Sequence, residues 1–182
     1  MNSIELLLNR QSNPFLTAPA PEGEALENIL KAGMRAPDHG GLQPWQFIIA
    51  ENSGLEKLST VFANTMNQLT DDEAKIEKAK NMPFRAPMII IITTQYQTHS
   101  KVPKQEQLVA AGCAAHAMQM AAFAQGYGAM WRTGDFSYNT EVKRALNIEK
   151  EQDIVGFLYI GSLKKLLPAK PLKNYQDCTR YL

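Results

Sequence analysis

Apolar residues recur at helical spacing in several stretches of the chain, and these stretches predict most of its helices. Leu55, Leu58 and Phe62 begin a series that continues to Leu69 in steps of three or four residues, as on one face of an α-helix. A second such series predicts a helix over 22–35, which must end before Pro37 because the residue preceding a proline disfavours helical geometry. Further helices are predicted over 4–9 with Ser3 as its N-cap, and over 71–82, 103–125 and 137–146.

Three uninterrupted apolar runs predict strands, over 46–50 (QFIIA), 88–94 (MIIIITT) and 154–160 (IVGFLYI). A fourth, shorter strand is predicted around 130–133. None of the three runs alternates apolar with polar residues, so both faces of each strand are expected to be covered. Helices should therefore lie on both sides of a central sheet, which is an α+β arrangement.

The predicted helix 103–125 is unusually rich in small residues, with nine alanines or glycines between Val109 and Ala124. Small side chains let other backbones approach closely on several sides. The helix is expected to form the buried axis of the molecule or of a dimer. An ordinary alanine-rich core helix explains the same composition, and the two interpretations are compatible.

Composition limits what the chain can be. Its 182 residues suit one domain, followed by an irregular arm over 162–182 that is rich in lysine and contains two prolines. Lys and Arg number 19 against 18 Asp and Glu, and this balance argues against nucleic acid or an anionic membrane as the main partner. The N-terminus does not resemble a signal peptide, and the longest apolar run is far shorter than the roughly 20 residues of a spanning helix. A reduced, soluble, cytoplasmic protein is expected.

The usual motifs of covalent, metal and nucleotide chemistry are missing from the sequence. It contains no GxGxxG, P-loop, HExxH or CxxC pattern, and its three histidines lie far apart. Two cysteines, Cys113 and Cys178, cannot form a disulfide framework. We therefore expect no metal site and no catalytic side chain. If the protein is an enzyme, a bound cofactor should supply its reactivity.

Three loops hold the remaining candidate residues. Arg10, Gln11 and Ser12 follow the first helix and suit a phosphate, although an Arg is also favoured at a helix C-terminus by the dipole. Arg35 and His39 lie in a loop shaped by two prolines and two glycines. The loop after the long helix carries Trp131, Arg132 and Thr133, which could line a flat aromatic ligand or form an edge strand with an exposed Arg. Arg85, before the strand 88–94, is interpreted as a solvated residue at a strand entrance.

The order of these segments resembles the nitroreductase family. Arg10-x-Ser12 is followed by APDHGGLQPWQF, MIIIITT, EQLVAAGCAAHAMQMAAFAQGYGAMWRTG and IVGFLYIG, and the resemblance extends from Ile4 to Gly161. It implies a central mixed or antiparallel sheet flanked by helices, in an intertwined homodimer that binds FMN at the interface between subunits.

The resemblance also implies roles for particular residues. Arg10, Gln11 and Ser12 would hold the FMN phosphate and ribityl chain, and Arg35 and His39 would reach a flavin held mainly by the other subunit. Trp131, Arg132 and Thr133 would lie along the isoalloxazine ring, with a backbone N–H near N5; Arg132 could serve the ring or the phosphate. The stretch Ala121, Ala122, Phe123, Ala124, Gln125 and Gly126 would border the nicotinamide.

Three positions depart from the family pattern. Many relatives carry a basic residue where Gln11 stands and an Asn where this chain has Gly41. Their basic pair after the last core strand has no clear match here, and Lys164, Lys165 and Lys170 are the candidates.

The expected activity is transfer of a hydride from NADH or NADPH, through the flavin N5, to a small nitroaromatic or quinone-like acceptor in two half-reactions. Two alternatives remain open at this point. One is a homodimeric flavin-binding or sensor protein without turnover, and the other is an α+β interaction module without a cofactor.

Overall fold

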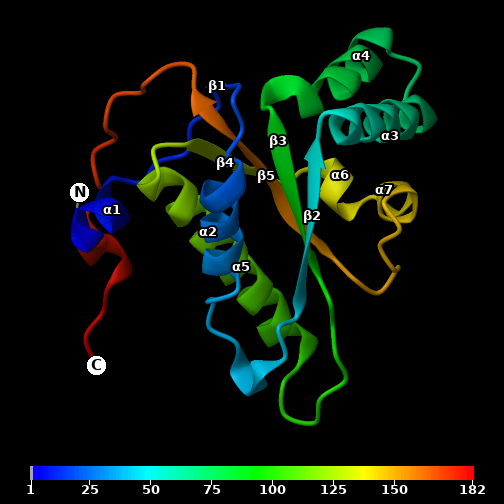
Figure 1. Cartoon of the computed structure of the whole chain (residues 1–182). Coiled ribbons are helices and arrows are strands. Elements are labelled where there is room, and N and C mark those ends of the chain that lie inside the picture. Colours follow the sequence, from blue (N-terminus) through cyan, green and yellow to red (C-terminus); the bar gives the residue numbers. More distant parts are fainter. Residues whose placement is uncertain (1) are drawn as a thin grey trace.

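The computed structural model describes residues 2–182, which form an antiparallel sheet with helices on both of its faces (Figure 1). The strand β5 pairs with β1, β3 and β4, and β2 pairs with the other edge of β3. The strands are β1 (Leu16–Thr17), β2 (Trp45–Glu51), β3 (Met88–Thr94), β4 (Gly128–Arg132) and β5 (Ile154–Leu163). Every pairing is antiparallel, so the predicted α+β fold with helices on both faces is confirmed.

The helices form two groups, one against each face of the sheet (Figure 1). One face packs against α2 (Gly23–Gly33) and α5 (Lys104–Ala124). The other packs against α3 (Ser53–Leu69), α4 (Glu73–Asn81), α6 (Asp135–Tyr138) and α7 (Thr140–Ala145). The remaining helical segments are α1 (Ser3–Asn9) and the short 3₁₀ turns η1 (His39–Gly41), η2 (Pro83–Arg85) and η3 (Tyr175–Cys178).

Strand β3 divides the core between these two groups. Ile89 and Ile91 join the cluster under α3, whereas Ile90 and Ile92 join the cluster under α5. This division follows from the period of two along a strand, which sends successive side chains to opposite faces. All seven residues of β3 are buried, as the apolar run predicted. We call these two sides the α3 face and the α5 face.

Close contact between α2 and α5 depends on a missing side chain. A Cβ atom on Gly33 would lie 2.9 Å from atoms of Met118 and of Phe47. Such a distance is too short for two carbon atoms in contact, so a larger residue at position 33 would push α2 away from α5 and the sheet.

Four local predictions need correction. Asn2, rather than Ser3, caps α1, because its side chain accepts from the Glu5 amide while the Glu5 carboxylate accepts from the Asn2 amide. The helix predicted over 137–146 is two short helices, since Asn139 interrupts it and caps α7. Strand β2 is an edge strand with exposed residues, Ile49 among them, so only part of it is covered. Strand β1 was not predicted, because two residues are too few to show a pattern.

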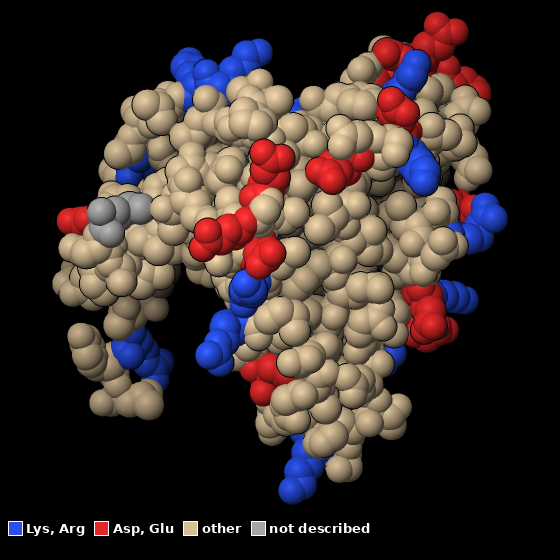
Figure 2. Space-filling model, in the orientation of Figure 1, with Lys and Arg blue, Asp and Glu red and all other residues tan. Residues whose placement is uncertain are grey.

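Charges of both signs are interspersed on the face drawn in Figure 2, in keeping with the near balance of the sequence. Among the helices of residues 2–182, none is both long and apolar enough to cross a membrane. The same residues contain no group of three or more His, Cys, Asp or Glu side chains that could hold a metal ion.

Candidate functional site

Adjacent residues of β4 point to opposite faces of the sheet. The indole of Trp131 lies on the α5 face, where its Nε1–H donates to the carbonyl oxygen of Val155 at 3.2 Å and its ring contacts the core cluster. The guanidinium carbon of Arg132 lies 5.5 Å from the ring centroid of Tyr159, which belongs to the α3 face. The two side chains thus lie on different faces of the sheet, although Trp131, Arg132 and Thr133 all line one cavity at the end of β4.

Arg10, Gln11 and Ser12 line a cavity of about 280 Å³ together with residues 169–173 of the C-terminal arm. Lys170 and Lys173 are among these arm residues, and no Asp or Glu lines the cavity. The Nη1 of Arg10 and the Oε1 of Gln11 are buried and have no hydrogen-bond partner among the described residues. We call this cavity the Arg10 pocket; its excess of cations and its unpaired donor favour an anion.

The arm is held against the Arg10 pocket by side-chain amides. Gln11 Nε2 donates to the carbonyl oxygens of Leu167 and Pro168, each at 3.2 Å. Asn13 Nδ2 donates to the carbonyl oxygen of Lys165 at 2.8 Å. Of the lysines considered from the sequence, Lys170 is therefore the one brought beside Arg10.

The pocket is tied to α5 by Gln119. This buried side chain donates through Nε2 to Ser12 Oγ at 3.3 Å and lies 3.4 Å from the carbonyl oxygen of Ala129, at the start of β4. Sequence reasoning missed Gln119. A polar residue inside a helix of alanines and methionines was the available signal, because a buried amide needs partners.

His39 lies in a different part of the molecule. Its Nδ1 is 2.6 Å from Glu106 Oε2. Both residues line a cavity of about 540 Å³, as do Val109 and Cys113. Arg35 follows α2, is exposed and forms no ion pair within residues 2–182. The turn η1, with His39, lies at the lower end of the view in Figure 1, away from α1 at the left. One chain thus does not bring Arg35 and His39 to the Arg10 pocket.

The candidate nicotinamide stretch forms the C-terminal end of α5 and the turn after it. Ala122 is buried, and Gln125 Nε2 donates to the carbonyl oxygens of Ala25 and Ala121, both at 3.1 Å. The side-chain amide of Gln125 thus links α5 to α2. Gly126 follows with a φ of 83°, a conformation that suits glycine as the residue after a helix.

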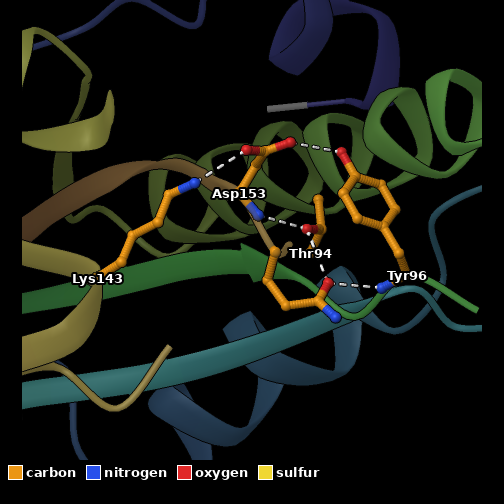
Figure 3. A network of polar contacts seen from close by, with 5 residues as sticks. Thr94, Tyr96, Lys143 and Asp153 are labelled. Carbon is orange, nitrogen blue, oxygen red and sulfur yellow. Dashed lines mark hydrogen bonds and ion pairs between the residues drawn. The ribbon is translucent and has the colours of Figure 1, made fainter. Parts of the chain in front are cut away.

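A separate polar network joins the end of β3 to the start of β5 and to α7 (Figure 3). Tyr96 Oη donates to Asp153 Oδ2 at 2.7 Å, and Lys143 Nζ lies 3.2 Å from Asp153 Oδ1. The Thr94 hydroxyl accepts from the Asp153 amide at 2.7 Å. Burial, and then the hydrogen bond and charge of Asp153, raise the pKa of Tyr96 to about 12. Because its members satisfy one another, the network is a structural connection between elements.

The comparisons with known proteins agree with this fold. The model of the nitroreductase family matches residues 8–162. The chain is 48% identical, over all of its length and 98% of the relative's, to an Escherichia coli K12 protein named "Putative NAD(P)H nitroreductase YdjA".

Solved structures resemble the fold at lower sequence identity. A nitroreductase-like family protein from Bacillus cereus superposes with a TM-score of 0.87 at 22% identity, covering 100% of this chain and 96% of the other. The FMN- and NADPH-dependent nitroreductase NfnB from a Sphigopyxis strain gives a TM-score of 0.78 at 16% identity, covering 100% and 99%. The sequence match extends over almost the whole chain, so the resemblance expected from the loop motifs is confirmed, and this protein belongs to the nitroreductase family.

Proposed function

We propose that the protein is an FMN-dependent oxidoreductase that passes a hydride from NADH or NADPH to a small nitroaromatic or quinone-like acceptor. The whole chain, residues 1–182, acts as a single domain in a homodimer, and we place the reaction in the cytoplasm, where both nucleotides are supplied. The observation that carries the proposal is the Arg10 pocket, a cationic cavity whose buried guanidinium nitrogen has no acceptor.

The chemistry of the Arg10 pocket suits the phosphate end of FMN. A phosphate monoester carries about −1.5 to −2 charges at neutral pH and three acceptor oxygens. Arg10 offers a planar set of donors, and Lys170 and Lys173 add two point charges. Gln11 Oε1, which is buried and has no donor, suits a ribityl hydroxyl. Lys170 and Lys173 of the arm thus supply the positive charge that many relatives carry at position 11.

A second copy of the chain would complete the site. Ile4, Leu7 and Leu8 of α1 are more than half exposed, and α5 and the arm expose Val109 and Leu172 in the same way. Exposed apolar residues on neighbouring segments mark interaction surfaces. Burying them between two chains would allow Arg35 and His39 of one subunit to approach the flavin of the other. Glu106 would then hold the His39 ring in position through its 2.6 Å contact.

The protein's own residues bind and orient the reactants. FMN, when bound, supplies the hydride acceptor and donor. The backbone N–H groups at the end of β4, from Trp131 to Thr133, provide fixed dipoles for the ring edge where negative charge develops on reduction. Trp131 forms one wall and is held by Val155 and Gly156. The end of α5, residues 121–126, borders the nicotinamide. No side chain is assigned as an obligatory acid or base, so orientation and electrostatics are the protein's contribution.

The test is spectroscopic. Purified protein, reconstituted with FMN if necessary, should show a flavin absorption spectrum and should be reduced without oxygen by NADH or NADPH. Addition of a quinone or nitroaromatic acceptor should restore the oxidised spectrum. Failure to bind FMN would overturn the proposal. Binding without reduction by either nucleotide would instead support a flavin-binding protein without turnover.

A further inference from the structure

A second cavity lies on the α3 face of the sheet, away from the Arg10 pocket. Its volume is about 360 Å³, which is within the range of small-molecule sites. The floor includes Tyr159 of β5, and the apolar walls include Phe62 of α3 and Phe136 of α6. Those two rings are stacked, with centroids 4.1 Å apart. Arg85 and Arg132 also line the cavity, so it combines aromatic walls with two cations. We call it the Arg85–Arg132 cavity.

Within residues 2–182, the two guanidinium groups have no carboxylate partner. No Asp or Glu lines the Arg85–Arg132 cavity, and neither arginine takes part in an ion pair within the described chain. The Nε of Arg132 is buried and has no acceptor in the described part of the chain. Arg85 is half-buried, so its interpretation as a solvated residue at a strand entrance is incomplete. Buried donors are normally paired, and this exception needs an explanation.

Tyr159 adds a neutral hydroxyl to the same cavity. Tyr159 is buried, with a relative exposure of 3%, and the Arg132 guanidinium lies over its ring. Burial raises the pKa of Tyr159, while the charges of Arg132 and Arg85 oppose that rise. The hydroxyl therefore stays protonated at neutral pH and can donate to an anion beside the two guanidinium groups.

We propose that the Arg85–Arg132 cavity binds a small organic carboxylate whose other end is aromatic or apolar. A carboxylate can accept two parallel hydrogen bonds from one guanidinium group. Its two oxygen atoms therefore suit a cavity that holds two Arg side chains. The rings of Phe62 and Phe136 would bury the apolar end, together with Met82 and Met130, which also line the cavity. An inorganic anion would leave these walls in water, so the apolar lining favours the organic ligand.

This cavity adjoins the proposed flavin site, because Trp131 and Thr133 also line it. The Arg132 guanidinium, however, lies over Tyr159 on the α3 face, whereas the Trp131 indole packs on the α5 face, so the carboxylate is a second ligand beside the flavin. The test uses holoprotein, saturated with FMN, and isothermal titration calorimetry with phenylacetate. Saturable binding of one phenylacetate per chain is expected. Phenylacetamide, which has the same shape and no charge, and inorganic phosphate, which has charge and no ring, should both bind at least about tenfold more weakly. Equal binding of either one would overturn the proposal, as would the absence of saturable phenylacetate binding.

Variants assign the binding to this cavity. Arg85→Met should weaken phenylacetate binding about tenfold or more, because it removes charge-assisted hydrogen bonds. Arg144→Met removes an exposed Arg that is paired with Glu141 and should change nothing. Tyr159→Phe, which keeps the ring, provides a second variant should Arg85→Met fail to fold. Unchanged affinity in the folded variants would overturn the proposal.

A final variant separates this site from the proposed function. Arg10→Ala should weaken FMN binding and leave phenylacetate binding intact. Loss of phenylacetate binding in Arg10→Ala, or displacement of FMN by phenylacetate, would place the ligand in the flavin site and overturn the second-site proposal. Failure of the protein to bind FMN at all would overturn the proposed function while leaving the phenylacetate measurement interpretable on the protein as purified.

Discussion

The indole of Trp131 lies directly over the α-carbon of Gly156, in the space that a Cβ atom at position 156 would fill. A Cβ built there would overlap the indole Nε1 and would lie 2.6 Å from its Cδ1 and 2.9 Å from the Arg132 carbonyl oxygen. The neighbouring Val155 carbonyl accepts the indole N–H. The position of Trp131 on the α5 face therefore depends on β5 having glycine at this point.

Gly156→Ala should lower the free energy of unfolding by about 1–3 kcal/mol, because the methyl group must displace the indole or β4. It should also weaken FMN binding, since Trp131 is proposed to form a wall of the flavin site. Chemical denaturation and FMN titration measure the two effects. Gly54→Ala is the control: its Cβ would meet Ala50 at an ordinary 3.6 Å, so stability should be unchanged or slightly higher.

Arg10→Ala should weaken FMN binding by about 10- to 100-fold, because a hydrogen bond to a charged group contributes roughly 1.5–3 kcal/mol. Titration of apoprotein with FMN, followed by flavin fluorescence, measures this change. Arg144→Ala removes an exposed Arg far along the sequence and should leave FMN affinity unaltered. Equal affinity of the Arg10 variant and the wild type would remove the phosphate assignment.

Val109→Arg should separate the proposed dimer and reduce FMN retention with it. Val109 lies on the exposed side of α5 and is 61% exposed in the single chain, which identifies it as a position that a partner would cover. Leu69→Arg is a matched control, because Leu69 is also 61% exposed but ends α3. Light scattering and flavin absorbance test both variants. A wild-type protein that is already monomeric, or a dimeric Val109→Arg variant, would refute the assembly.

Tyr96→Phe tests the network of Figure 3 through its dependence on pH. At pH 7 the variant should be less stable by about 1 kcal/mol, having lost the hydrogen bond to Asp153. The folded-state pKa of Tyr96 is raised from 10.0 to about 12, so between these values the folded protein keeps a proton that the unfolded chain loses. The unfolding free energy of the wild type should therefore fall over this pH range.

Because Tyr96→Phe has no such proton, the stability gap between the two proteins should narrow as the pH rises from 10 to 12. Denaturant unfolding at several pH values measures the gap, and other groups that titrate in this range are common to both proteins. A gap that stays constant would show that the Tyr96 hydroxyl does not titrate as the burial and the Asp153 contact imply.

The apolar pattern was sufficient to predict the main elements. The run MIIIITT is a fully buried strand, and the helix starting at Leu55 lies where its spacing predicted. Helix boundaries that are set by single polar side chains were harder to predict. Asn2 and Asn139 act as caps through specific hydrogen bonds, and neither bond follows from periodicity.

In the candidate site, too, some residues were predictable from local sequence and others were not. Arg10, Gln11 and Ser12 were identifiable as a phosphate-binding candidate because residue type and local spacing suffice for that inference. The contribution of Gln119, the choice of Lys170 among the lysines, and the cavity shared by Arg85 and Arg132 were not predictable, because each joins segments distant in sequence.

The sequence by itself determined which segments form helices and strands, that their core is shared between two helical layers, and that the chain resembles the nitroreductase family. These properties depend on local spacing and on residue types, which can be read along a chain. Only the tertiary structure decided that the side chains of Trp131 and Arg132 lie on opposite faces of the sheet and that the arm reaches Arg10. The physical reason is that the pairing register of β4 with β5, and the packing of the arm on Asn13 and Gln11, are contacts between distant residues.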